Sequence, residues 1–99
     1  MAAALAACSS PSLKYQGTAP HEAEVAGLRV DVYSVPGDKP GRVDAQAIIL
    51  SGVLGVGAAE LQEIAALAIE EAAEGTPCEL VGRSIRGAST VWTARLDCA

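Results

Sequence analysis

The stretch that decides the fold is CELVGRSIRGASTVWTARLDC, residues 78–98, which begins and ends with a cysteine. Two strand-like runs flank the turn residues 87–89, a pattern typical of a β-hairpin. Pairing that is symmetric about Ala88 sets Arg86 opposite Thr90, Ser84 opposite Trp92, Gly82 opposite Ala94, Leu80 opposite Leu96 and Cys78 opposite Cys98. Directly opposed Cα atoms lie about 4.5–5.5 Å apart, which is within the range that a disulfide accepts. The hairpin therefore predicts a disulfide between Cys78 and Cys98.

This cysteine pairing has consequences for stability and location. A disulfide that closes a loop of ~20 residues stabilises a fold by about 3 kcal/mol, and paired thiols indicate an oxidising compartment. The register has one unfavourable feature, because it sets Glu79 opposite Asp97, which has the same charge. The alternative to a disulfide is that Cys78 and Cys98 are two inert buried thiols. Zinc binding and thioredoxin-like chemistry are disfavoured, since the cysteines and the distant His21 lack ligand spacing and no Cys-x-x-Cys motif is present.

Upstream of the hairpin, AAELQEIAALAIEEAAEG, residues 58–75, has the period of an amphipathic helix. Apolar residues recur at helical spacing at Leu61, Ile64, Ala65, Ala68 and Ala72. Gly75 followed by Pro77 gives the expected stop. The helix carries no basic residue and five acidic ones, namely Glu60, Glu63, Glu70, Glu71 and Glu74. We interpret the glutamates as a solvated face, with weak divalent-cation binding as the alternative.

Two segments before the helix predict strands. In VAGLRVDVYSV, residues 25–35, Leu28, Val30 and Val32 alternate with Arg29, Asp31 and Tyr33. In RVDAQAIILSG, residues 42–52, one side carries Val43, Ala45, Ala47 and Ile49, although a helical start near Asp44 is the alternative. A Pro- and Gly-rich turn at 36–41 joins the two segments. The order β-β-α-β-β predicts an α+β fold over residues 25–99, an antiparallel sheet with the one helix packed on one face.

Composition limits the size of the core and the kind of partner. A chain of 99 residues forms at most one domain. Because the sequence has no Phe and one Trp, its small core needs a covalent cross-link to be stable. The net charge of −5 argues against nucleic acid, which requires a basic surface, and against a face that docks on anionic lipid. The apolar runs are shorter than the ~18 residues of a membrane span.

A third cysteine lies in ALAACSSPS, residues 4–12. Leu5-Ala6-Ala7-Cys8 resembles the lipobox of bacterial lipoproteins, in which a Leu and two small residues precede an invariant Cys. The resemblance covers four residues. It implies that residues 1–8 are the remnant of a signal peptide and that acylated Cys8 anchors the domain to the membrane. The residues after it, 9–24, are then a flexible linker. A serine directly after the cysteine, Ser9, resembles the outer-membrane sorting pattern of some bacterial lipoproteins. We therefore expect the domain to be anchored in the outer membrane and to face the periplasm.

The sequence contains no specific catalytic, cofactor or metal motif. AIILSGVLGVGAAE, residues 47–60, has the strand, glycine turn and helix order of a phosphate cradle. However, Glu60 stands where a dinucleotide motif requires its third glycine, so we interpret these glycines as turn and packing residues. His21 is the one histidine, and we expect it in the linker without a fixed partner.

The last hairpin offers a weaker signal of a contact surface. Arg83, Arg86 and Arg95 could form a small basic patch, although such residues more often line an exposed sheet face or pair with Glu. Trp92 is expected in the core, because an exposed Trp would instead mark a partner site.

Two functional hypotheses follow from these features. The first is a small, non-catalytic envelope lipoprotein domain that acts through contacts with an envelope protein, without a cofactor or metal. The alternative is a periplasmic small-ligand-binding or inhibitor module, which needs a concave pocket on the sheet face or between helix and sheet. A hydrolase or other enzyme is a third and weaker hypothesis, since the one histidine lies outside any catalytic motif.

Overall fold

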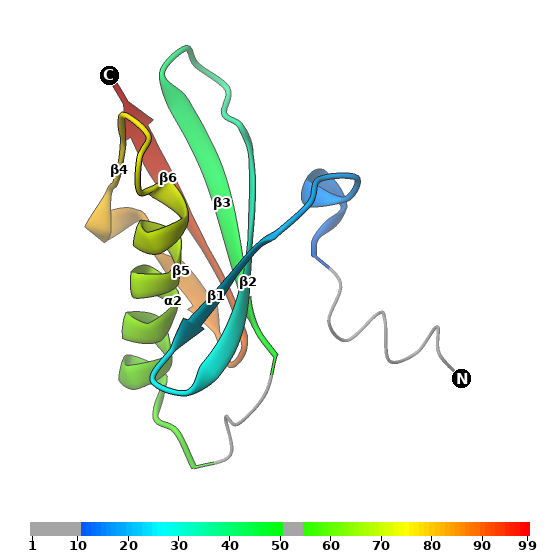
Figure 1. The fold of residues 1–99 in the computed structure, drawn as a ribbon, viewed down its shortest axis with the longest axis vertical. Coiled ribbons are helices and arrows are strands. Elements are labelled where there is room, and N and C mark those ends of the chain that lie inside the picture. Colours follow the sequence, from blue (N-terminus) through cyan, green and yellow to red (C-terminus); the bar gives the residue numbers. More distant parts are fainter. Residues whose placement is uncertain (1–10, 51–54) are drawn as a thin grey trace.

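The fold is a curled antiparallel sheet with one long helix against one face (Figure 1). This computed structural model describes residues 11–50 and 55–99. The strands are β1 (His21–Val25), β2 (Leu28–Pro36), β3 (Arg42–Ile49), β4 (Cys78–Leu80), β5 (Arg86–Ala88) and β6 (Val91–Cys98). The helix is α2 (Ala58–Ala73), and two short 3-10 helices are η1 (Leu13–Tyr15) and η2 (Gly82–Ser84). The α+β class and the helix on one face of the sheet are therefore confirmed.

The sheet has the order β1-β2-β3-β6-β4, and β5 pairs with β6 as well. The chain contributes two more strands than the predicted β-β-α-β-β order, because β1 precedes the predicted first strand and the first strand of the last hairpin is divided into β4 and β5. The predicted strand at 42–52 is confirmed over Arg42–Ile49, which excludes the helical alternative near Asp44.

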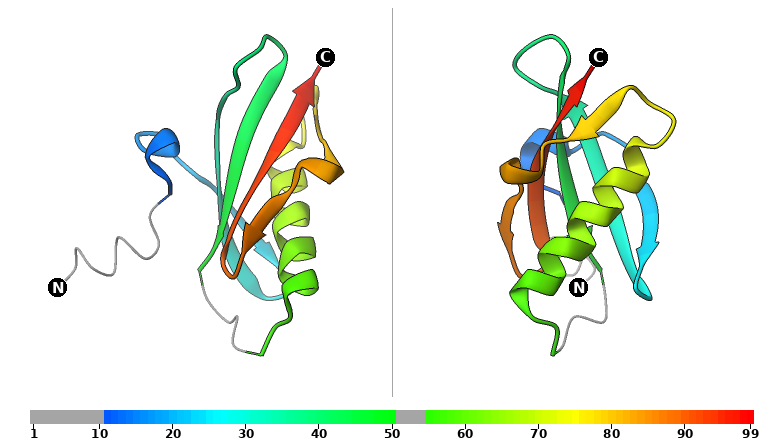
Figure 2. Two further views of the ribbon diagram at one scale, coloured as in Figure 1. Left: turned by 180° about the vertical axis from the view of Figure 1, so that it is seen from behind. Right: turned by 90° about the vertical axis from the view of Figure 1, so that its left-hand side faces the viewer.

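The main core lies between α2 and the inner face of the sheet, as the right-hand view of Figure 2 shows. The helix buries the predicted stripe, namely Leu61, Ile64, Ala65 and Ala68, together with Ile69. The sheet supplies Val30, Val32, Ala45, Ala47, Ile49, Trp92, Ala94 and Leu96. Trp92 is in this core as expected, and its Nε1 donates to the Ser89 carbonyl at 3.0 Å. Alanines at the helix–sheet contact let the two layers approach closely, which partly offsets the scarcity of aromatic residues.

The linker predicted at 9–24 is wrong over much of its length. Its last residues form β1, which pairs with β2 through the two-residue loop Ala26-Gly27. Both loop residues have positive φ, 53° and 79°, the backbone that a tight hairpin of this kind requires. The folded domain therefore begins before residue 25.

A second part of that predicted linker covers the outer face of the sheet. The segment that carries η1 folds back over this face, on the side away from α2 (Figure 2, left). There Tyr15, which is 4% exposed, packs with Tyr33 and Ile48 in a small second core. We call this segment, residues 11–16, the N-terminal strap. β2 is consequently buried on both faces at its centre, rather than on one face as its alternation predicts.

The last hairpin follows the predicted register at its open end only. Cys78 pairs with Cys98, Glu79 with Asp97 and Leu80 with Leu96, as expected. Near the turn, Arg86 pairs with Thr93, Gly87 with Trp92 and Ala88 with Val91, so the predicted partners of Arg86, Ser84 and Gly82 are wrong. The register differs by three residues between the two ends, and the three residues of η2 account for the difference. The loop is Ser89-Thr90, with Ser89 at φ 57°.

Ser84 is the residue that accommodates η2 in the sheet. Its Oγ accepts a hydrogen bond from the Arg95 backbone N–H at 2.8 Å and donates to the Val81 carbonyl at 2.6 Å. The Val81 N–H in turn donates to the Arg95 carbonyl at 2.9 Å. The hydroxyl thus takes the place of a backbone group of the partner strand, and the edge backbone remains paired where the strand is interrupted.

Candidate functional site

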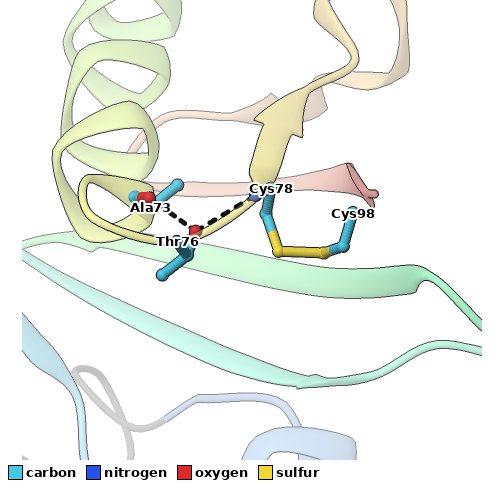
Figure 3. The surroundings of a disulfide bond; sticks show 4 residues. All are labelled: Ala73, Thr76, Cys78 and Cys98. Carbon is cyan, nitrogen blue, oxygen red and sulfur yellow. Dashed lines mark hydrogen bonds between the residues drawn. A yellow bond between two sulfur atoms is a disulfide. The ribbon is translucent and has the colours of Figure 1, made fainter.

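The predicted disulfide joins Cys78 of β4 to Cys98 of β6, with their Cα atoms 3.9 Å apart (Figure 3). The Ala99 N–H donates to the Pro77 carbonyl at 3.1 Å, so the cysteines occupy a non-hydrogen-bonded position, where opposed Cα atoms are closest. Thr76 Oγ1 donates to the Ala73 carbonyl at 2.6 Å and accepts from the Cys78 N–H at 3.2 Å. The disulfide therefore fixes the end of the chain beside the end of α2. Cys8, the predicted lipidation site, lies outside the described residues.

An open groove of about 610 Å³ lies on the outer face of the sheet, opposite α2. It lies between the N-terminal strap on one side and the η2–β5 segment on the other, and β3 and β6 form its floor. The residues that line it are Ser12, Lys14, Tyr15, Asp44, Gln46, Arg83, Ser84, Arg86, Thr93, Ala94 and Arg95. We call it the basic groove.

The strap wall of the groove is held by polar contacts to β3. Gln46 is 2% exposed, and its Oε1 accepts from the Ser12 N–H while its Nε2 donates to Ser12 Oγ, both at 2.8 Å. Lys14 Nζ donates to Asp44 Oδ2, and this contact raises the pKa of Lys14. Two consecutive outward residues of β3 therefore position the strap, because side chains two apart on a strand share a face.

Charge distinguishes this groove from the rest of the surface. Four of the seven Lys and Arg residues line it, but Asp44 is the one lining residue among the twelve acids. Within the described residues, Arg83, Arg86 and Arg95 take part in no ion pair, and the buried Nε of Arg95 has no hydrogen-bond partner. With Lys14 neutralised by Asp44, three uncompensated positive charges face one depression of a protein whose net charge is −5.

The arginines of this groove were identified in the sequence, but the other half of the site was not. The patch of Arg83, Arg86 and Arg95 follows from the hairpin alone. Ser12 and Lys14 join it only because the strap folds back across the sheet, and the alternation of β3 gives no signal for this. An apolar residue in an outward position of the same strand, Ile48, was the available clue that something covers this face.

A smaller depression of about 440 Å³ adjoins the disulfide and has the opposite charge. It is lined by Glu70, Ala73, Glu74, Gly75, Thr76, Cys78, Glu79 and Leu80. Across residues 11–50 and 55–99, no three His, Cys, Asp or Glu side chains are grouped closely enough to hold a metal ion. The two depressions therefore differ in charge, with glutamates lining the smaller one and arginines lining the basic groove.

The one histidine does have a partner, contrary to expectation. His21 begins β1, and its Nε2 lies 2.8 Å from Glu71 Oε2 on α2. Both side chains are exposed, so this contact attaches the edge strand to the helix without forming a pocket. The glycine-rich segment weighed as a phosphate cradle lies partly outside the described residues, at 51–54, and its Gly57 precedes the first turn of α2.

None of the helices in the described part of the chain is long and apolar enough to cross a membrane. The chain matches no protein-family model, no curated protein and no solved structure.

Proposed function

We propose that this chain is a small, non-catalytic lipoprotein domain of the bacterial envelope, anchored through Cys8 and acting through contacts with another envelope protein. In this proposal the domain faces the periplasm, from the outer membrane. The observation that carries the proposal is the Cys78–Cys98 disulfide. Disulfides persist in exported proteins and are rare in the reducing cytosol, so the bond supports the export that the lipobox-like tetrad implies.

The position of the third cysteine adds to this support. Cys8 is four residues before Ser12, where the strap is hydrogen-bonded to the sheet. A cysteine so close in sequence to the folded domain, with the other two already paired, suits an attachment point. Acyl chains on such a cysteine hold a domain at a bilayer because each buried CH₂ contributes about 0.8 kcal/mol.

The groove supports binding in preference to catalysis. Its side chains are arginines, a lysine–carboxylate pair, hydroxyls and an amide. A nucleophile activated by an adjacent base requires a second group such as His within hydrogen-bond reach, and the one histidine lies at the helix side of the sheet. Arginines without acidic partners are typical of sites that recognise anionic groups.

The second candidate is a periplasmic small-ligand-binding or inhibitor module. The basic groove favours this second candidate, because the groove is a concave site on the sheet face. The groove is open and polar, however, whereas small-ligand pockets enclose most of their ligand and are largely apolar. The helix–sheet interface, the other location considered for a ligand, is filled by core side chains.

Fatty-acid labelling tests the anchoring part of the proposal. The protein is expressed from its own gene in a bacterial host supplied with an alkyne-bearing fatty acid, and the purified chain is examined for label. We expect label on the natural chain and none on Cys8→Ser. Absence of label from the natural chain would overturn the lipoprotein assignment. Cross-linking in the envelope tests the second part, because a protein-contact role requires a reproducible cross-linked partner.

A further inference from the structure

We infer that the basic groove binds the phosphate group of an anionic membrane lipid beside the Cys8 anchor. The anchor itself rests on the proposed function, whereas the phosphate-binding chemistry rests on the groove alone. Lipid contact by this face turns α2 and its glutamates away from the bilayer, and leaves them free to contact a protein.

The donor groups of the groove suit a phosphate. Arginine presents N–H groups in a planar fork that matches two phosphate oxygens at once. Arg83, Arg86 and Arg95 come from η2, β5 and β6, and no described carboxylate pairs with any of them. The buried Arg95 Nε lacks a partner, so it is an N–H donor that a ligand could satisfy.

The position of the groove relative to Cys8 selects lipid as the source of that phosphate. Ser12 lines the groove, and four peptide units join it to Cys8. A chain of four residues spans at most about 14 Å, even when fully extended. A lipid-modified Cys8 therefore holds the groove within reach of the headgroup layer, where phosphates are the most concentrated anions. An acidic protein segment has no comparable reason to be present there.

The net charge of −5, which argued against a lipid-facing surface, does not describe this face. Four of the twelve acids lie on α2 and a fifth, Glu74, caps its C-terminus, beyond the thickness of the sheet. The helix alone is about 10–12 Å across, and charges further apart than about 8 Å are largely screened at physiological salt. The acids that do adjoin the groove are Asp44, paired with Lys14, and the opposed residues Glu79 and Asp97 at the next outward position beyond Arg95. The carboxylates of Glu79 and Asp97 mark one edge of the basic region, which is therefore small. Its size suits one lipid headgroup and not an extended anionic membrane surface.

Binding is tested on the full chain carrying Cys8→Ser, so that lipidation does not enter the result. Nuclear magnetic resonance spectra are recorded during titration with a short-chain phosphatidylglycerol, the matching phosphatidylcholine and inorganic phosphate. Flotation with vesicles of phosphatidylcholine, with and without phosphatidylglycerol, measures surface binding. We expect phosphatidylglycerol to shift the signals of Ser12, Arg83, Arg86 and Arg95, and to increase flotation in a manner that salt reverses.

A matched pair of double variants identifies the groove as the site. Arg83→Gln with Arg86→Gln removes two exposed groove charges, whereas Arg29→Gln with Lys39→Gln removes two charges elsewhere on the surface. A basic residue near an anionic surface contributes about fivefold in affinity, so the groove variant is expected to bind about 25-fold more weakly. The control variant should lose much less than this.

Several outcomes would overturn the inference. Equal losses in the two double variants would mean that binding follows net charge and not the groove. Shifts with inorganic phosphate but no flotation with phosphatidylglycerol vesicles would reject lipid as the source. Tighter binding of a glutamate-rich peptide than of phosphatidylglycerol would identify an acidic protein segment as the occupant.

Discussion

The Gln46 side chain and Ser12 share two hydrogen bonds of 2.8 Å, although 34 residues separate them in the chain. One bond satisfies the backbone N–H of Ser12, and the other joins the amide to its hydroxyl. The pair ties the N-terminal strap to the middle of β3 and places Tyr15 over Tyr33 and Ile48. A single buried amide therefore holds the strap, one wall of the basic groove, at its Ser12 end.

Replacing Gln46 by Leu should release the strap while preserving most of the side-chain volume. The Ser12 N–H and hydroxyl both lose their partner, and a lost hydrogen bond costs about 0.5–1.5 kcal/mol. We expect the free energy of unfolding in urea to fall by that order, and amide hydrogen exchange to quicken over residues 12–16.

Ser12→Ala is the matched control for this change, because it removes the hydroxyl bond but keeps the backbone bond. It should cost less than Gln46→Leu and leave the Ser12 amide protected. Unchanged exchange in Gln46→Leu would mean that the Tyr15 packing and the Lys14–Asp44 contact retain the strap without Gln46.

The disulfide should account for a large share of the stability of this small domain. Its two cysteines are 20 residues apart, and closing a loop of that length stabilises a fold by about 3 kcal/mol. Cys78→Ala with Cys98→Ala should lower the thermal midpoint strongly, and a reducing agent should lower the midpoint of the natural chain and not that of the double variant. Cys8→Ser serves as the control and should leave the midpoint unchanged. A natural chain insensitive to reduction would contradict the prediction.

Ser84→Ala should destabilise the edge of the sheet where η2 interrupts the strand. The variant removes the acceptor of the Arg95 N–H and the donor to the Val81 carbonyl. We expect a loss of about 1–2 kcal/mol in unfolding free energy. Ser34→Ala, an exposed serine of β2, should change it by no more than a few tenths. Similar losses in the two variants would show that the Ser84 bonds contribute nothing of their own.

Gly87→Ala tests the close approach of β5 to Trp92. A Cβ atom at Gly87 would lie 2.3 Å from the Val91 carbonyl oxygen and 2.7 Å from the Trp92 Cα, so backbone must move. Overpacking of this kind typically costs about 1–3 kcal/mol, and it should also alter Trp92 fluorescence. Gly82→Ala is the control, because no atom lies within 4 Å of a Cβ there. A Gly87→Ala protein as stable as the natural chain would contradict the β5–β6 register.

The sequence predicted those parts of the fold that depend on local periodicity. The stripe of α2 and the alternation of β2 and β3 are each contained in one segment, so reading them needs no knowledge of distant contacts. The strap and β1 were missed because both are short and lie among Ser, Pro, Gly and Thr residues, and the alternation of β1 covers five residues only. They are ordered by partners elsewhere in the chain, namely Gln46 for Ser12 and β2 for β1.

The hairpin shows how a correct pairing can follow from an incomplete argument. Symmetry about Ala88 led to the right partner for Cys78, although the loop is centred between Ser89 and Thr90, which shifts the register by three residues, and η2 holds three residues out of the ladder. The two departures cancel at the open end. A 3-10 turn inside a strand depends on Ser84 meeting Arg95 across the sheet, and strand propensity does not indicate such a contact.

Alkaline pH should loosen the strap through Tyr15. Burial raises the pKa of its phenol above the ordinary value of 10, and burial raises the pKa of Tyr33 likewise. A group whose pKa is raised in the folded state contributes stability that is complete below its unfolded pKa and is lost as the pH rises beyond it. The unfolding free energy should therefore be constant up to about pH 10 and fall above it, and the tyrosinate absorbance should develop later than in the unfolded chain. Tyr15→Phe preserves the ring packing but removes one of the three raised titrations, which are those of Tyr15, Tyr33 and Lys14, so its alkaline loss should be smaller than that of the natural chain. An identical alkaline loss in the two proteins would assign the effect to other groups.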